Sequence, residues 1–182
     1  MRVSIQTEDF DLTAEVAKLR SQDGRVGAVC SFIGTVRDRN VAPTLPAARG
    51  SLPPEGALSP WGGPAAKDGT SVASMELEHY PGMTERAIEA MIDAAHARFD
   101  ILGARVVHRV GLLRPLDQIV LVAVSSSHRG ESFKACEFLM DYLKTQAPFW
   151  KKEQTPQGAR WVDARSSDDA ALAKWGIAAR NL

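Results

Sequence analysis

The sequence predicts an α+β fold built as a single domain over residues 1–182. Segments with strand-like alternation and segments with helical spacing follow one another, and the order mixes hairpins with helices. The chain has 182 residues, of which 45% are hydrophobic, which is enough for one well-filled core and short for two. No internal repeat is visible.

The N-terminal part is predicted to form a strand, a helix and a second strand. Val3 and Ile5 alternate with polar residues, and apolar residues recur at helical spacing over residues 12–19. Residues 25–36 are rich in apolar, β-prone residues and end directly before Arg37. We therefore expect a strand that carries an arginine at its end.

The next segment, at about residues 41–72, is predicted to be a flexible insertion. It holds six of the ten prolines, is otherwise rich in Gly, Ala and Ser, and shows neither helical nor strand periodicity. Such a composition does not easily build a core. We expect a mobile flap near the functional site or a subunit contact, with no chemistry of its own.

Order returns in the second half of the chain. Strands are predicted at residues 75–80, 104–110 and 118–125, and the last is a nearly continuous apolar run that indicates burial on both faces. A helix capped by Thr84 is expected between the first two. Its apolar face is predicted to contain Ile88, Met91, Ile92, Ala95 and Phe99.

A longer helix is predicted over residues 130–144. Its buried face is expected to contain Phe133, Cys136, Met140 and Leu143. A last strand at Trp161–Val162 and a terminal helix at residues 168–174 complete the prediction.

Charge and composition exclude several classes of function. The formal net charge is +0 and the pI about 6.9, so we expect no nucleic-acid partner and no recruitment to an acidic membrane. The N-terminus lacks an apolar signal core, and no run reaches the roughly 20 apolar residues of a membrane span. Cys30 and Cys136 form no CxxC pair, which predicts small core residues, no disulfide or zinc site and a reducing cytoplasm. We also expect no cofactor.

The most informative segment brings two lysines to either side of a proline. Pro148 cannot donate a backbone hydrogen bond and disfavours a helical Ala147, so a helix ending near Lys144 must turn before Lys151. Neighbouring positive charges disfavour one another's protonation, so one amine would become neutral while the other charges hold an anion. Alternatively, Lys144 is a solvated lysine favoured by the helix dipole, and Asp141 could pair with it.

A second cationic segment lies between the buried strand and the long helix. His128 and Arg129 occupy a join where free backbone N–H groups can bind an anion. His128 could instead be structural, and Arg37 could be a surface arginine paired with a nearby carboxylate. Together, Arg37, the His128–Arg129 pair and the two lysines predict one pocket for anions.

Four segments resemble the large, catalytic subunit of molybdopterin synthase. They are Phe32-Ile33-Gly34-Thr35-Val36-Arg37, Leu77-Glu78-His79-Tyr80-Pro81-Gly82-Met83, Ser127-His128-Arg129, and Asp141-Tyr142-Leu143-Lys144 with Ala147-Pro148-Phe149-Trp150-Lys151-Lys152-Glu153. The resemblance covers nearly the whole chain apart from residues 41–72 and about the last dozen. The insertion replaces what is usually a short connection in the family.

The resemblance implies a fold, an assembly and a reaction. The fold is an α/β hammerhead with an additional antiparallel sheet, and the assembly is a homodimer that binds a small ubiquitin-like sulfur-carrier subunit at each end, as a heterotetramer. The carrier's C-terminal thiocarboxylate would transfer sulfur to cyclic pyranopterin monophosphate, and two rounds would create the dithiolene of molybdopterin in molybdenum cofactor biosynthesis.

The resemblance also implies site residues. Lys144 and Lys151 look like the family's essential lysines, with a catalytic role. The implied substrate-binding set is Thr35, Val36, Arg37, His128, Arg129, Lys152, Glu153 and Arg165.

Two other functions fit parts of the sequence. A non-enzymatic module that binds a ubiquitin-like tail or a phosphorylated ligand would also need a basic pocket. It would tolerate Lys144→Arg, which keeps the charge, whereas a transferase that uses the amine would not. A structural dimer with a vestigial site would have lost one of the matching basic positions, and all five are present.

Overall fold

The two strands predicted near the N-terminus and the two predicted between residues 104 and 125 assemble into one sheet. In the computed structural model, which describes residues 1–21, 23–40, 70–156, 158–162 and 174–176, this large sheet has the order β1-β6-β8-β2. Its strands are β1 (Val3–Gln6), β6 (Gly103–Arg109), β8 (Gln118–Ser126) and β2 (Ala28–Thr35). β1 runs parallel to β6, and the other neighbours are antiparallel.

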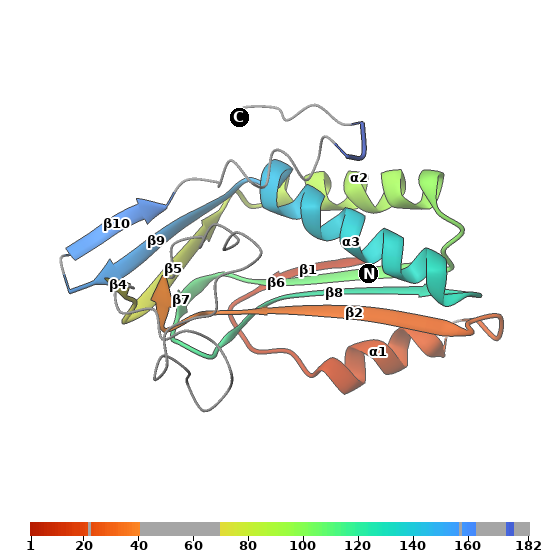
Figure 1. The fold of residues 1–182 in the computed structure, drawn as a ribbon, viewed down its shortest axis with the longest axis horizontal. Coiled ribbons are helices and arrows are strands. Elements are labelled where there is room, and N and C mark those ends of the chain that lie inside the picture. Colours follow the sequence, from red (N-terminus) through yellow and green to blue (C-terminus); the bar gives the residue numbers. More distant parts are fainter. Residues whose placement is uncertain (22, 41–69, 157, 163–173, 177–182) are drawn as a thin grey trace, which may run out of the picture.

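Helices cover both faces of the large sheet (Figure 1). α1 (Leu12–Arg20) lies on one face, and α2 (Met83–Arg98) and α3 (Arg129–Gln146) lie on the other. The central strand β8 is buried on both faces, as its apolar sequence predicted, with Leu121 packing toward α1 and Val122 toward α3. Each such side chain contributes roughly 1.5–3 kcal/mol when it leaves water.

A second, small sheet extends from the end of the large one (Figure 1). Its order is β10 (Gly158–Val162), β9 (Phe149–Thr155), β5 (Ser74–His79) and β7 (Gly111–Leu113), all antiparallel. A buried cluster joins this sheet to the end of β2. It consists of Val36, Met75, Leu77 and Leu113.

Most predicted elements are confirmed, and the strand order and helices give the predicted α+β class. The strands that were not predicted include β7 and β9. β9 carries the sequence FWKKEQT, which is too polar to read as a strand, and it forms because β5 and β10 pair with it on its two sides.

Two local predictions were wrong. Thr84 does not cap α2: the helix begins after Gly82, which has a φ of 78°, and the Glu85 carboxylate accepts a hydrogen bond from the Gly82 N–H at 2.6 Å. Phe133 is not inward either, because α3 turns Ala135, Cys136 and Leu139 toward the core and leaves 59% of Phe133 exposed.

Several predictions fall outside the described residues. The insertion is described only at its borders, where β3 (Arg39–Asn40) pairs with β4 (Thr70–Ser71) and Val72 is buried. Arg165 and residues 168–173 of the terminal helix are likewise not described, and residues 174–176 form a turn. Within the described helices, none combines the length and apolar character needed to cross a membrane.

Candidate active site

α3 divides the predicted site residues into two groups. His128 is the N-cap of α3, Arg129 is its first residue and Lys144 lies in its last turn. Sixteen residues of helix at about 1.5 Å each separate His128 from Lys144 by about 24 Å. The end of the molecule that carries His128 and Arg129 is called the histidine end below, and the opposite end of α3 the lysine end.

Arg37 belongs to the lysine end. β2 and β8 run antiparallel, with Ala28 opposite Ser126 and Thr35 opposite Gln118, so β2 finishes at the end of the sheet remote from His128. Val36 is buried and anchored at both backbone groups: its N–H donates to the Asp117 carbonyl and its own carbonyl accepts from the Leu116 N–H, each at 2.9 Å. The exposed Arg37 side chain therefore starts from a fixed backbone position.

Lys151 and Glu153 also lie at the lysine end. In the β5–β9 ladder, Lys151 is opposite Leu77 and Glu153 is opposite Met75. Directly opposite residues of an antiparallel pair share a face, so both side chains point to the face where Leu77 and Met75 pack against Val36. Glu153 is only 1% exposed and holds the Lys151 ammonium at 3.1 Å. Glu153 thus fixes the Lys151 amine on the face of the small sheet that packs against Val36.

Lys144 is exposed in the last turn of α3, and Asp141 does not compete for it. The Asp141 carboxylate instead accepts hydrogen bonds from the Lys174 ammonium and the Trp175 indole, both at 2.8 Å. Asp141 therefore does not form the ion pair with Lys144 that their spacing allowed. The sequence could not predict this, because the partners of Asp141 are more than thirty residues away along the chain.

Two of the predicted substrate-binding residues present little to a pocket at the lysine end. Side chains alternate along β9, so Lys152 projects from the opposite face to Lys151 and lies 5.5 Å from the centre of the Trp161 ring. There it lines a small cavity of about 100 Å³ with Glu76 and Gln154. Val36 is 1% exposed, so its side chain is not available to a ligand, whereas Thr35 is exposed.

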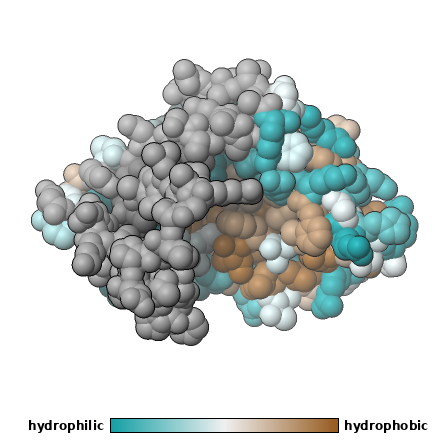
Figure 2. Space-filling model, in the orientation of Figure 1, coloured by the Kyte–Doolittle hydropathy of each residue, from teal (hydrophilic) through white to brown (hydrophobic). Residues whose placement is uncertain are grey.

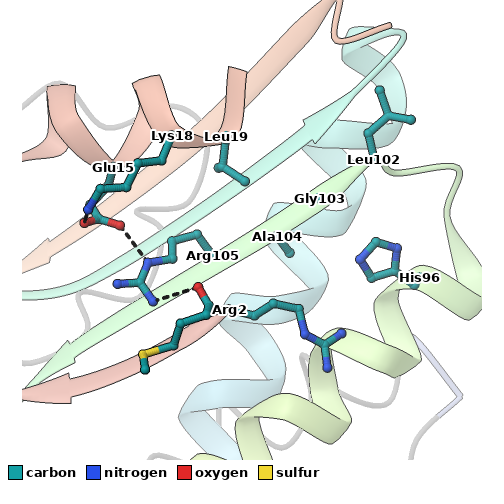
Figure 3. Close-up of a pocket in the computed structure, with 10 residues that line it drawn as sticks. Arg2, Glu15, Lys18, Leu19, His96, Leu102, Gly103, Ala104 and Arg105 are labelled. Atoms are coloured by element: carbon teal, nitrogen blue, oxygen red, sulfur yellow. Dashed lines mark hydrogen bonds and ion pairs between the residues drawn. The ribbon is translucent and has the colours of Figure 1, made fainter. Parts of the chain in front are cut away.

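A larger cavity, of about 480 Å³, is lined by none of these residues (Figure 3). It opens between α1, β6 and the start of the chain, and its charged groups are already paired. Glu15 contacts both Lys18 and Arg105, and Arg2 pairs with Glu89 and Asp93. Its volume does not make it the site, because none of the predicted site residues lines it.

The two cysteines remain free thiols, as the sequence predicted. Burial raises the pKa of the Cys136 thiol to about 12, with a further contribution from the neighbouring Cys30. A thiol with so high a pKa is a poor nucleophile near neutral pH. Cys136 is therefore a packing residue of the core.

His108 is a buried residue near the site that sequence reasoning did not identify. Its ring stacks on Phe149, the first residue of β9, with centroids 3.8 Å apart and planes 16° apart. Its Nδ1 lies 2.8 Å from the Arg109 carbonyl oxygen, which can only accept, so Nδ1 carries the proton. The one available signal was alternation along the strand, which puts His108 on the same face as the buried Val106.

His108 is expected to make the protein sensitive to acid. Burial lowers the pKa of His108 to about 4 from its ordinary 6.5, and nearby His79 adds to that effect. Because the unfolded chain takes up the proton first, the free energy of unfolding falls as the pH drops from about 6.5 to about 4, by roughly 3 kcal/mol in total. Denaturant titrations at pH 7 and pH 4 should show a smaller loss of unfolding free energy for His108→Phe than for the wild type.

The exposed His96 provides the control, since His96→Gln should lose as much unfolding free energy as the wild type. Equal losses in all three proteins would contradict the assignment of the acid sensitivity to His108.

Comparisons with known proteins agree on one family. Residues 5–146 match the family model described as MoaE protein. The chain is 56% identical to a molybdopterin synthase catalytic subunit from Ralstonia nicotianae. The match extends over 179 residues and covers 98% of this chain and 86% of that protein. Among solved structures, the molybdopterin biosynthesis MoaE protein from Burkholderia ambifaria is 52% identical, with a TM-score of 0.72 over 97% of this chain and 98% of that one.

A more distant structure shares the fold. It is titled as a protein–protein complex of subunits 1 and 2 of molybdopterin-converting factor from Helicobacter pylori. The match is 16% identical, with a TM-score of 0.61 over 91% of this chain and 93% of that one.

Proposed function

The chain belongs to the MoaE family of molybdopterin synthase catalytic subunits, and from this premise we propose that it transfers sulfur to cyclic pyranopterin monophosphate. The sulfur donor is the C-terminal thiocarboxylate of a small ubiquitin-like carrier subunit, and two transfers build the dithiolene of molybdopterin. The observation that supports the proposal is the placement of Arg37, which follows β2, Lys144 in the last turn of α3 and Lys151 on β9 at the lysine end.

The charges at this end suit the two reactants. The thiocarboxylate and the cyclic phosphate are both anions, so they repel one another unless fixed positive groups lie between them. Lys151, which Glu153 holds in place, positions the phosphate together with Arg37. Lys144 contacts the thiocarboxylate, where it assists the attack of sulfur or transiently holds the acyl end.

His128 and Arg129 reach the same pocket only if a second copy supplies them, because α3 holds them about 24 Å from Lys144 within one copy. β2 is an edge strand of the described large sheet, and its eight residues, AVCSFIGT, carry no charge. Uncharged edge strands are ready to pair with another chain. We therefore place the contact between copies along β2.

The surface beside β2 supports this contact. Phe32 on β2 is 41% exposed, the exposed Phe133 lies on the neighbouring α3, and Figure 2 shows a hydrophobic patch at the centre of this view. A two-fold axis through β2 would pair the two strands antiparallel. The Arg37 end of one copy would then lie beside the Ala28 end of the other, where β8 leads into His128.

The carrier completes the assembly. The relative from Helicobacter pylori is titled as a complex of two subunits of the converting factor, and its fold is shared by this chain. We propose the same kind of partner here: one carrier bound to each copy of a homodimer, with its tail entering at the lysine end.

A reconstitution tests the function directly. The purified protein is mixed with a thiocarboxylated carrier subunit and cyclic pyranopterin monophosphate, and dithiolene product is measured. We expect product that depends on both partners and two carriers consumed for each molecule of product. Tight binding of the carrier without any product would favour the rival function, a non-enzymatic binding module.

A further inference from the structure

The two lysines of the lysine end are carried by different elements, and a short bend sets their spacing. α3, which carries Lys144, ends at Gln146, and β9, which carries Lys151, begins at Phe149. Ala147 is extended, with φ −83° and ψ 127°, as expected before a proline. The segment Ala147–Phe149 is called the lysine bend below. Any change in its angle moves Lys151 relative to Lys144.

One contact on the lysine bend comes from the large sheet. The His108 ring lies flat on the Phe149 ring, 3.8 Å from centroid to centroid. His108 is itself fixed, because β6 pairs it with Ile5 on one side and Val120 on the other, and its Nδ1–H donates to the Arg109 carbonyl at 2.8 Å. Since the ring is 9% exposed, it offers Phe149 a rigid platform.

A second contact comes from α2. The Thr84 hydroxyl lies 3.2 Å from the Pro148 carbonyl oxygen and 3.1 Å from the Tyr80 carbonyl oxygen, and donates its single proton to one of them at a time. The same hydroxyl accepts a hydrogen bond from the Tyr80 N–H at 3.1 Å. Thr84 is fully buried, so water does not replace this contact.

We propose that His108 and Thr84 are positioning residues that lock the lysine bend and so set the spacing between the Lys144 and Lys151 amines. The proposal rests on the proposed function for its catalytic consequence. Neither residue touches the reactants; each acts through Phe149 or Pro148. The two contacts reach adjacent residues of the bend from independent elements, so each restrains a motion that the other leaves open.

Kinetics of four variants test the role. His108→Ala removes the platform, and Thr84→Val removes the hydroxyl while keeping the shape. Each should lower kcat by about 10–100-fold, since misplacement of a reacting group by about 1 Å can cost this much, with the KM for cyclic pyranopterin monophosphate changed less. His108→Phe restores a flat ring and Thr84→Ser restores the hydroxyl, so both should recover kcat to within about threefold of the wild type.

A matched control separates positioning from loss of stability. Val107 is buried on the opposite face of the same strand and packs toward α1, away from the lysine bend. Val107→Ala should destabilise the fold while leaving kcat near the wild-type value. The proposal is overturned if His108→Ala and Thr84→Val keep wild-type kcat, or if Val107→Ala lowers kcat as much as they do.

A second readout does not depend on activity. A short bifunctional amine reagent is added to the folded protein, and the Lys144–Lys151 cross-link is quantified by mass spectrometry. We expect the yield to change in His108→Ala and Thr84→Val and to return to wild type in His108→Phe. If the wild type forms no dithiolene but the cross-link responds in this way, the proposed function fails and the locked bend stands. An unchanged cross-link in all variants overturns the locked bend, whatever the activity.

Discussion

Replacing Lys144 by alanine is expected to lower the rate of dithiolene formation by roughly 10²–10⁴-fold, the range that a single proton-transfer or charge-stabilising group supplies. Folding should be unaffected. The side chain is exposed and Asp141 is engaged by Lys174 and Trp175, so the free energy of unfolding should change by no more than about 0.5 kcal/mol. Rates measured under single-turnover conditions with a thiocarboxylated carrier will isolate the sulfur-transfer step.

Lys144→Arg distinguishes an enzyme from a binding module. Arginine keeps the positive charge but replaces the compact amine with a guanidinium that stays protonated. A transferase that uses the amine should remain impaired in Lys144→Arg, while a binding module should recover fully.

Lys134 provides the matched control for both variants. It is exposed on the same helix and pairs with Glu131 at 3.2 Å. Lys134→Ala should therefore be as active as the wild type. If Lys144→Ala is as active as Lys134→Ala, Lys144 has no part in the reaction.

The sequence identified the elements whose own pattern is strong. The continuous apolar run of β8 and the helical spacing of α2 and α3 were enough to place them, because their buried faces determine where they lie. β9 was missed because its pairing partners β5 and β10, rather than its residues, make it a strand. Phe133 was predicted to be inward because helical spacing alone does not tell which face of α3 packs against the sheet.

The sequence named residues for the candidate site but did not give their arrangement. Arg37, Lys144 and Lys151 lie at the ends of elements, as the sequence indicated, and the structure brings them to one end of the molecule. The sequence predicted one pocket for all of the cations, whereas α3 separates His128 from Lys144 by about 24 Å within one copy. The contact of His108 with Phe149 had no sequence signal, because it joins two sheets across forty residues of chain.

A shared site makes a strong prediction for mixtures of inactive variants. Lys144→Ala disables the lysine end of each copy, and Arg129→Ala disables the histidine end; each homodimer then has two defective sites. In a mixed dimer with the proposed symmetry, one site contains both substituted residues. The other site contains neither, because it combines the unchanged lysine end of one copy with the unchanged histidine end of the other. The intact site should work at its normal rate, since the two sites lie at opposite ends of the shared strand pair.

The most direct measurement is therefore the activity of these two variants alone and after their subunits are exchanged by co-expression. Each variant alone should be inactive in the reconstituted assay, and the exchanged mixture should recover about one quarter of the wild-type rate, because half of the dimers are mixed and each has one intact site of two. Recovery would establish that cations from two copies form the site. A mixture no more active than its parents, or an Arg129→Ala protein with wild-type activity, would contradict the account.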